Sequence, residues 1–401
     1  MNRTDQPAPA PLLTTAWGDL GLTRFPENPR DQLRAWDAAD TYLLRHLAEA
    51  GTDLTGAVTV VGDRWGALAT ALTGVPGCSP TVISDSYLGQ QATSANLTRN
   101  GHTGARLLTT QDAPPARIDV LLVRVPKSLA LLEDQLHRLR PAVHENTVVI
   151  GTGMVKEIHT STLNLFERII GPTRTSLAEK KARLIFSEPG PAADPASVAN
   201  PWPHTYQLPS DIGPLSGRPV VNHAGVFCAE HLDIGTRFLL QHLPRGTDAR
   251  TIVDLGCGNG VVGTSAALTH PDADILFTDE SHQAVASARA TYEENAGDRP
   301  GKAEFRVADG LADTPPGSVD LVLNNPPFHS HQATTDATAH RMFSQARAAL
   351  RPGGELWVVG NRHLGYHVKL RRLFGNSQLV ASNAKFVILK AVKREPRGRR
   401  A

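Results

Sequence analysis

The sequence predicts two consecutive α/β domains, each built on a largely parallel sheet with helices on both faces. Three observations support this fold class. The chain has 401 residues, enough for two or three separately buried cores. Short apolar runs alternate with helix-length segments through both halves, as in strand-helix-strand units. The halves also repeat the same spacings between particular glycines, acids and prolines, which indicates that one unit occurs twice.

In the second half, six short apolar runs are predicted strands. They are RTIVDLG, ADILFTD, KAEFRVAD, VDLVLNNPP, GELWVVGN and AKFVILKAV, between residues 250 and 392. The first half has five such runs, AVTVVGD, PTVISD, ARLLTT, IDVLLVRVP and NTVVIGT, between residues 57 and 152. Helix-length segments between successive runs favour parallel pairing, because a parallel connection needs a long crossover.

The shared spacings indicate a tandem duplication of one α/β unit. In each half two glycines stand four residues apart, and an aspartate follows the first glycine by 23 residues. These residues are Gly62, Gly66 and Asp85 in the first half, and Gly256, Gly260 and Asp279 in the second. The copies differ where chemistry is expected, since VVGDRWGALA lacks two of the glycines of DLGCGNGVVG, and RVPKS stands in place of NNPPF.

A proline-rich segment without apolar periodicity separates the two halves. It runs from Ser187 to Pro214. We therefore expect a degenerate domain at residues 1–190, a linker at 191–214 and a catalytic domain at 215–401.

Composition excludes several classes of protein. With 40% hydrophobic and 20% charged residues and no run of ~20 apolar residues, the chain is not expected to span a membrane. The start MNRTDQPAPAPLL lacks the features of a secretory signal, so we expect a cytoplasmic protein. Three scattered cysteines do not predict disulfides or a zinc site, and His329, His331 and His340 match no metal-ligand spacing. No metal is expected, and a monomer is favoured.

The segment from Asp254 to Gly260 is the first candidate for a binding site. It follows the strand TIV and precedes the helix-like VVGTSAALTH, where small residues let a ligand approach the backbone. The residues expected to contact the ligand are Asp254, Gly256, Cys257, Gly258 and Gly260. A tight turn without a ligand, or the dinucleotide fingerprint GNGVVG, also fits the glycines. Asp254 argues against a pyrophosphate and favours an ammonium group, such as that of S-adenosylmethionine.

Two further aspartates end the next strands. Asp279 follows ADILFT and precedes a helical segment, so it is either a helix cap or an acceptor for ribose hydroxyls, and the glycines upstream favour the second role. Asp309 ends FRVAD and is placed to contact the adenine amino group; a solvated turn acid is the alternative.

The turn Asn325-Pro326-Pro327-Phe328 predicts a site for an aromatic amine. It ends the strand VDLVL at the same sheet edge as the glycine turn, so Asn325 is also expected near the cofactor. Prolines stiffen the turn and remove backbone donors. The amide oxygen of Asn325 and the carbonyl of Pro326 then form two acceptors aimed at one NH2 group, while Phe328 offers a face for stacking a base.

DLGCGNG with NNPPF resembles the class I S-adenosylmethionine-dependent methyltransferases that act on planar or conjugated amino nitrogens. More narrowly, GVFCAEHLDIGTRFLLQHLP, TDESHQAVASAR, NNPPFHSHQATTD and GNRHLGYHVKLRRLFGN are similar to the small-domain ribosomal RNA guanine-N2 methyltransferases, especially those of the large subunit. The first half shares the likeness through LRAWDAADTYLL, SDSYLGQQATSANLTRNG and VRVPKSLALLEDQL. Only the proline-rich leader and the long linker depart from the pattern.

This resemblance implies a fold of two class I methyltransferase-like domains, the first inactive, and methyl transfer to N2 of a guanine in 23S rRNA. The alternatives are the same reaction on 16S rRNA, and methylation of adenine N6 or of protein glutamine at an NPPF-type site. Two other classes are an oxidoreductase built on GNGVVG, which Asp254 disfavours, and a non-catalytic RNA-binding module.

Basic residues indicate where RNA is held. Arg124 stands at the position equivalent to Asn325, and Lys127 follows Pro126, so cations replace the amine acceptor in the first half. Near the C-terminus, ten Lys or Arg residues oppose a single acid between Lys369 and Arg400, and they include Arg371 and Arg372. We expect the first domain to position RNA, with the basic C-terminal segment extending the same electrostatic surface.

Overall fold

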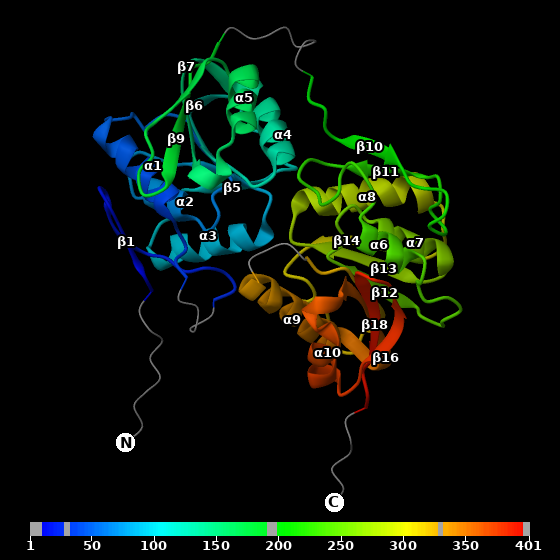
Figure 1. Cartoon of the computed structure of the whole chain (residues 1–401). Coiled ribbons are helices and arrows are strands. Elements are labelled where there is room, and N and C mark those ends of the chain that lie inside the picture. The colour runs from blue at the N-terminus through cyan, green and yellow to red at the C-terminus, as the bar shows by residue number, and fades with distance from the viewer. Residues whose placement is uncertain (1–9, 28–32, 191–198, 328–331, 396–401) are drawn as a thin grey trace, which may run out of the picture. The chain divides into compact units, whose positions relative to one another are not determined.

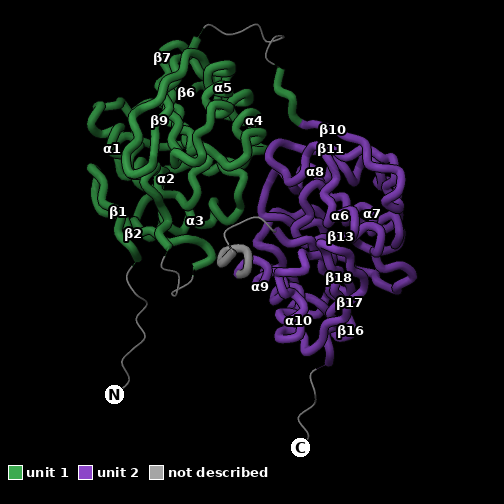
Figure 2. Tube along the Cα trace, viewed as in Figure 1, with its two compact units in different colours: residues 1–202 green, residues 203–401 purple. Residues whose placement is uncertain are grey.

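The computed structural model of the chain describes residues 10–27, 33–190, 199–327 and 332–395 (Figure 1). The chain divides into two compact units, Met1–Trp202 and Pro203–Ala401, called unit 1 and unit 2 below (Figure 2). In the part of the chain that the structure describes, no helix has both the length and the apolar character needed to cross a bilayer.

Unit 1 contains a mixed sheet of seven strands in the order β5-β4-β3-β6-β7-β9-β8. The first five in this order are parallel, and β9 runs antiparallel to both neighbours. The strands are β3 (Val58–Val61), β4 (Thr81–Ser84), β5 (Arg106–Thr109), β6 (Ile118–Arg124), β7 (Val143–Met154), β8 (Thr173–Thr175) and β9 (Ala182–Ser187). The helices are α1 (Ala38–Glu49), α2 (Ala67–Thr73), α3 (Tyr87–Arg99), α4 (Leu129–Leu139) and α5 (Thr160–Ile169), with short 3-10 turns at Arg140–Ala142 and Val155–Glu157. A separate hairpin joins β1 (Leu12–Thr15) to β2 (Gly18–Gly21).

Unit 2 repeats this order as β14-β13-β12-β15-β16-β18-β17, with β18 antiparallel to both neighbours. Its strands are β12 (Thr251–Leu255), β13 (Asp274–Asp279), β14 (Ala303–Val307), β15 (Val319–Asn324), β16 (Leu350–Asn361), β17 (Gln378–Ser382) and β18 (Phe386–Val392). The helices are α6 (Ile234–Leu240), α7 (Val261–Thr269), α8 (His282–Ala296), α9 (Gln332–Ala349) and α10 (Tyr366–Phe374), and a 3-10 turn spans Arg362–Leu364. The pair β10 (His204–Gln207) and β11 (Pro219–Asn222) is antiparallel.

The identical strand orders confirm the predicted fold class of two tandem α/β copies. Each predicted apolar run contains a strand of the sheet. The sequence pattern did not predict β8, β9 and β17, which form short antiparallel pairs at one edge of each sheet. It also did not predict β10, which lies inside the segment expected to be a linker and pairs with β11 in unit 2.

Helices cover both faces of each sheet because the central strands are apolar on both faces. On β12, Ile252 belongs to the core formed with α6, α7 and α8, whereas Val253 belongs to the core formed with α9 and α10. Successive side chains of a strand point to opposite faces, so neighbouring residues enter different cores. In unit 1, α1 and α2 pack on one face and α4 and α5 on the other. The carboxyl ends of the parallel strands remain open to build a site.

Candidate active site

A cavity of about 400 Å³ lies at the carboxyl ends of β12, β13 and β15 in unit 2. Helix α9 and the segment leading into α6 close its other sides. Nine predicted site residues line it: Asp254, Gly256, Cys257, Gly258, Asp279, Asp309, Asn325, Pro326 and Pro327. Phe328, His329 and His331 lie outside the described residues. Among the side chains that the structure describes, no group of three His, Cys, Asp or Glu is arranged to hold a metal ion.

The glycines of the turn after β12 serve different purposes. Gly256, Gly258 and Gly260 all have positive φ angles, of 73°, 52° and 78°, which side chains with a Cβ rarely adopt. A Cβ on Gly258 would meet nothing within 4 Å, so there is open space beside this glycine in the cavity wall. A Cβ on Gly260 would lie 2.6 Å from the Cα of Ala288. Gly260 does not line the cavity, and its role is to let α7 pack against α8 rather than to contact a cofactor.

Asp254 lies beneath this turn and is only 3% exposed. Its Oδ2 accepts the backbone N–H of Gly263 at 2.7 Å, which ties the strand end to the first turn of α7. Burial raises the pKa of Asp254 to about 8, against the opposing effect of the Gly263 hydrogen bond. A cation bound in the cavity would favour the ionised form of this carboxyl group.

Asp279 holds the turn with both of its oxygens. Oδ2 accepts the N–H of Gly258 at 3.1 Å, and Oδ1 accepts the N–H of Ser281 at 3.1 Å. The cap of α8 is Ser281, whose hydroxyl accepts the N–H of Ala284. Asp279 is therefore not the helix cap, and its carboxylate lies at the cavity wall where the sequence places a ribose acceptor.

Asp309 is linked to α9, which the sequence did not predict to contribute to the site. Its Oδ1 pairs with Nη2 of Arg341 at 3.1 Å, and its backbone carbonyl accepts from Nε2 of Gln345 at 3.0 Å. Arg341 and Gln345 also line the cavity. The side chain of Asp309 is therefore not a solvated turn acid.

Asn325 lines the cavity and is held in place through its amide nitrogen. Its Nδ2 donates to Oγ1 of Thr236 at 2.9 Å, with Oδ2 of Asp233 at 3.5 Å. Its Oδ1 is buried and has no hydrogen-bond partner within the described part of the chain. Pro326 and Pro327 follow it along the wall. The amide oxygen is therefore without a partner, and the acceptor role that the sequence predicts for it stays a prediction.

Six residues that precede β12 in the chain line the cavity but were not predicted as site residues: Tyr206, Phe227, Cys228, Leu232, Asp233 and Thr236. Asp233 is the N-cap of α6, Thr236 lies in its first turn, and Phe227 is 52% exposed. The pattern Asp-x-x-Thr in LDIGT is a helix N-cap signal, and it predicts the helix start but not its place beside Asn325.

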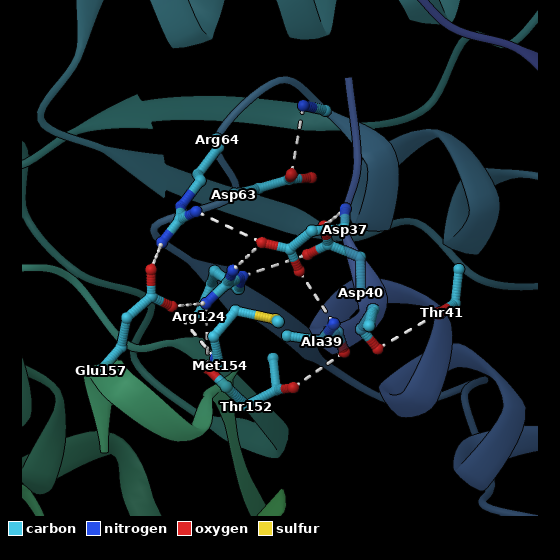
Figure 3. Close-up of polar contacts among 12 residues, drawn as sticks. Asp37, Ala39, Asp40, Thr41, Asp63, Arg64, Arg124, Thr152, Met154 and Glu157 are labelled. Carbon is cyan, nitrogen blue, oxygen red and sulfur yellow. Dashed lines mark hydrogen bonds and ion pairs between the residues drawn. The ribbon is translucent and has the colours of Figure 1, made fainter. Parts of the chain in front are cut away.

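In unit 1 the position equivalent to Asn325 is occupied by Arg124, whose side chain forms a network of ion pairs (Figure 3). The side chain of Arg124 is fully buried, and its guanidinium pairs with Asp37 at 2.6 Å, Glu157 at 3.1 Å and Asp40 at 3.2 Å. Arg64, at the position of Gly258, pairs with Glu157 at 2.8 Å and Asp37 at 3.3 Å. The prediction that Arg124 contacts RNA is wrong, because three acids hold its guanidinium inside the unit.

The other predicted RNA contacts are on the surface. Lys127 follows β6, and Arg371 and Arg372 lie on α10; all three are exposed. Within the described residues, none of the three forms an ion pair. These cations are available to a phosphate backbone.

The fold and the cavity define a class I methyltransferase, whose cofactor is S-adenosylmethionine. Two family models match the chain, the RLMG N-terminal domain over residues 10–191 and the Methyltransferase small domain over residues 217–390. Together they cover most of its length. The chain belongs to the family of the ribosomal RNA large subunit methyltransferase G.

Individual relatives agree with this assignment. The ribosomal RNA large subunit methyltransferase G of Streptomyces coelicolor is 71% identical over 383 residues, which cover 95% of this chain and 100% of the relative. The protein of the same name from Ectopseudomonas mendocina is 49% identical over 385 residues, covering 96% and 100%. Among solved structures, the 16S rRNA N2 methyltransferase RsmC of T. thermophilus, in complex with AdoMet and guanosine, has a TM-score of 0.72 at 21% identity. The match covers 96% of this chain and 98% of that one, and at this identity it shows the fold.

Proposed function

We propose that unit 2 transfers a methyl group from S-adenosylmethionine to the exocyclic N2 of a guanine in 23S rRNA. The observation that carries this proposal is the unpartnered, buried Oδ1 of Asn325 in the wall of the cavity. A hydrogen-bond acceptor held there, followed by two prolines, suits an NH2 group on a planar ring.

The chemical difficulty is that the lone pair of the guanine amine is delocalised into the ring. Asn325 Oδ1 and the carbonyl of Pro326 accept its two hydrogens and steer the nitrogen towards tetrahedral geometry, which makes the lone pair available. S-adenosylmethionine, when bound, supplies the methyl group of its sulfonium, and the sulfur departs as a neutral thioether. The product ammonium then loses its proton to solvent, so a strong base is not required at the outset.

The residues present fit this cofactor. Gly258 leaves open space in the cavity wall, and the carboxylate of Asp279 beside it suits ribose hydroxyls. Asp254 offers a buried carboxyl group to the ammonium of the methionine end. We assign the contact with the adenine amino group to Asp309, whose carboxylate is paired with Arg341.

A guanine inside a helix is too deep to reach this cavity, so the target base comes from a loop or is flipped out of its stack. We assign the stacking face for that base to Phe328. Unit 1 and the basic residues of α10 position the rRNA through phosphate contacts. We assign the reaction to the cytoplasm, where rRNA is found.

The direct test is to incubate the purified protein with labelled S-adenosylmethionine and 23S or 16S transcripts, and to identify the methylated nucleoside by mass spectrometry. We expect N2-methylguanosine in 23S rRNA. The same nucleoside in 16S rRNA only would move the substrate to the small subunit. N6-methyladenosine, or methylglutamine in a protein substrate, would overturn the proposed acceptor.

The RNA surface has a separate test. Replacing Arg371 by Ala should weaken rRNA binding and lower the slope of log affinity against log salt by about 1, because one phosphate contact is lost. Arg168→Ala on α5 is the control, since the guanidinium of Arg168 is exposed but already paired with Glu133 at 2.6 Å. Equal slopes for Arg371→Ala and the parent would remove Arg371 from the RNA surface.

A further inference from the structure

We infer that Asp233 and Thr236 are positioning residues that fix which atom of the Asn325 amide faces the acceptor base. The inference rests on the proposed function, in which the oxygen of Asn325 receives an amine hydrogen. It concerns a different part of the site, since both residues precede the first strand of the sheet.

The first step is the polarity of the Thr236 hydroxyl. Asp233 is the N-cap of α6, and its Oδ2 accepts the backbone N–H of Thr236 at 2.8 Å. The same oxygen lies 3.2 Å from Oγ1 of Thr236. A carboxylate has no hydrogen to give, so the hydroxyl of Thr236 is the donor in this contact.

The second step is the orientation of the amide. Once its hydrogen points at Asp233, Oγ1 of Thr236 accepts at its remaining lone pairs, and the contact with Asn325 at 2.9 Å needs a donor. Only Nδ2 of the amide supplies one, and it also faces Oδ2 of Asp233 at 3.5 Å. Oδ1 is therefore the atom left for the cavity. A rotated amide would set its oxygen against two acceptors and turn a donor towards the donor amine.

Unit 1 keeps the same arrangement with different chemistry. Asp37 caps α1, Asp40 is the third residue of that helix, and both hold the side chain of Arg124 at the end of β6. Asp233, Thr236 and Asn325 occupy the equivalent places at α6 and β15. The link between the first helix and the strand end thus recurs in both units. In unit 2 it leaves one acceptor atom unused.

The test uses the full chain with Thr236→Val, Thr236→Ser and Asp233→Ser. Valine has no hydroxyl, so the amide is free to rotate, and we expect kcat to fall roughly tenfold to a hundredfold, as for other residues that orient a reacting group. The Kd for S-adenosylmethionine, measured by calorimetry, should stay within about twofold of the parent. Serine restores the hydroxyl and should recover most of the lost kcat.

Asp233→Ser separates polarity from folding. Serine is a good helix cap whose hydroxyl oxygen accepts the N–H of Thr236, so α6 should persist, but that hydroxyl also carries a hydrogen that it can donate to Oγ1 of Thr236. The hydroxyl of Thr236 is then free to donate to Oδ1 of Asn325, and we expect the loss in kcat to match that of Thr236→Val. Because of its cap, this variant decides the matter if the valine variant is unstable.

Two results would overturn the inference. One is parental kcat in Thr236→Val or Asp233→Ser. The other is a Kd for S-adenosylmethionine that weakens by the same factor as kcat/KM, which would make these residues cofactor contacts. Asn325→Ala is measured beside them: if it retains parental turnover, the proposed acceptor itself is wrong, whereas an impaired Asn325→Ala with parental Thr236→Val refutes the positioning role alone.

Discussion

The two units differ in chemistry at the end of the fourth strand of the sheet, which is β6 in unit 1 and β15 in unit 2. In unit 1, Arg124 donates to three carboxylates and is fully buried. In unit 2, the amide nitrogen of Asn325 donates to Thr236 of helix α6, and its oxygen has no partner among the described residues. The backbone is equivalent in the two units, so the difference lies in the side chains. The guanidinium of Arg124 is paired with carboxylates on all sides, whereas the buried oxygen of Asn325 lacks a partner, and such an unpaired polar atom favours a ligand that can donate to it.

The glycine turns differ in the same way. Gly258 leaves part of the cavity wall open, whereas Arg64 at the equivalent position sends its guanidinium to Glu157 and Asp37. Arg64 and Arg124 thus share two acids, and the two substitutions support each other. Unit 1 therefore differs from unit 2 by more than its missing glycines. The ion pairs of Arg64 and Arg124 stand at the positions where unit 2 has the cavity residues Gly258 and Asn325.

The largest effect should come from breaking the buried ion pairs of Arg124 in unit 1. Arg124→Met leaves the carboxylates of Asp37, Asp40 and Glu157 without their buried cation, which should lower the free energy of unfolding by about 3–5 kcal/mol. The control is Arg168→Met, which breaks an exposed pair and should cost about 0–1 kcal/mol. Denaturant titration of both variants measures the difference. Similar values for the two would mean that the buried network contributes no more than a surface pair.

The next largest effect concerns the acceptor of unit 2. Asn325→Ala should lower kcat by about 10²–10³, because an acceptor that acts on the target nitrogen is lost, while affinity for S-adenosylmethionine changes little. Single-turnover methylation of 23S rRNA, with calorimetric Kd values, separates the two quantities. An equal loss in both would show that Asn325 serves the cofactor rather than the amine.

A matched pair of aspartates compares the two turns directly. Asp279→Ala should weaken binding of S-adenosylmethionine by about 1–3 kcal/mol, the range for hydrogen bonds to a charged group. Asp85→Ala, at the equivalent position of unit 1, should leave the affinity unchanged. Calorimetry should give one cofactor per chain. Two bound cofactors, or a weaker Kd in the Asp85 variant, would show that unit 1 is also a cofactor site.

The last effect is a pH dependence of unit 1. Burial alone would raise the pKa of Glu157, but the hydrogen bond and charge of Arg64, with the charge of Arg124, bring it down to about 2. A carboxyl group whose pKa is lowered by folding stabilises the native state above its unfolded pKa of about 4.5, and this contribution disappears as the pH falls towards 2. The parent should therefore be more stable than Glu157→Gln at pH 6, with the difference shrinking between pH 4.5 and 2. Denaturant titrations over this range test it, and a constant difference would contradict it.

Residues close in sequence could be predicted, and residues joined only by the fold could not. The strand-turn-helix spacings were enough to predict the parallel strands of both sheets and nine residues of the cavity wall, including Asp279 and Asn325. Thr236 lies 89 residues from Asn325 in the chain, and no local pattern links them. The error on Arg124 has the same origin, since its partner Asp37 is 87 residues away and a cation at a strand end is otherwise expected to be solvated.

Helix α6 also determines how short an N-terminally truncated fragment of unit 2 can be while keeping its site. A fragment beginning at Thr251 would keep all seven strands of the sheet and the complete glycine turn. It would lack Asp233 and Thr236, so the Asn325 amide would have no partner to set its orientation. The smallest transplantable catalytic module is therefore larger than its sheet, and a fragment or chimaera of unit 2 has to begin upstream of Asp233.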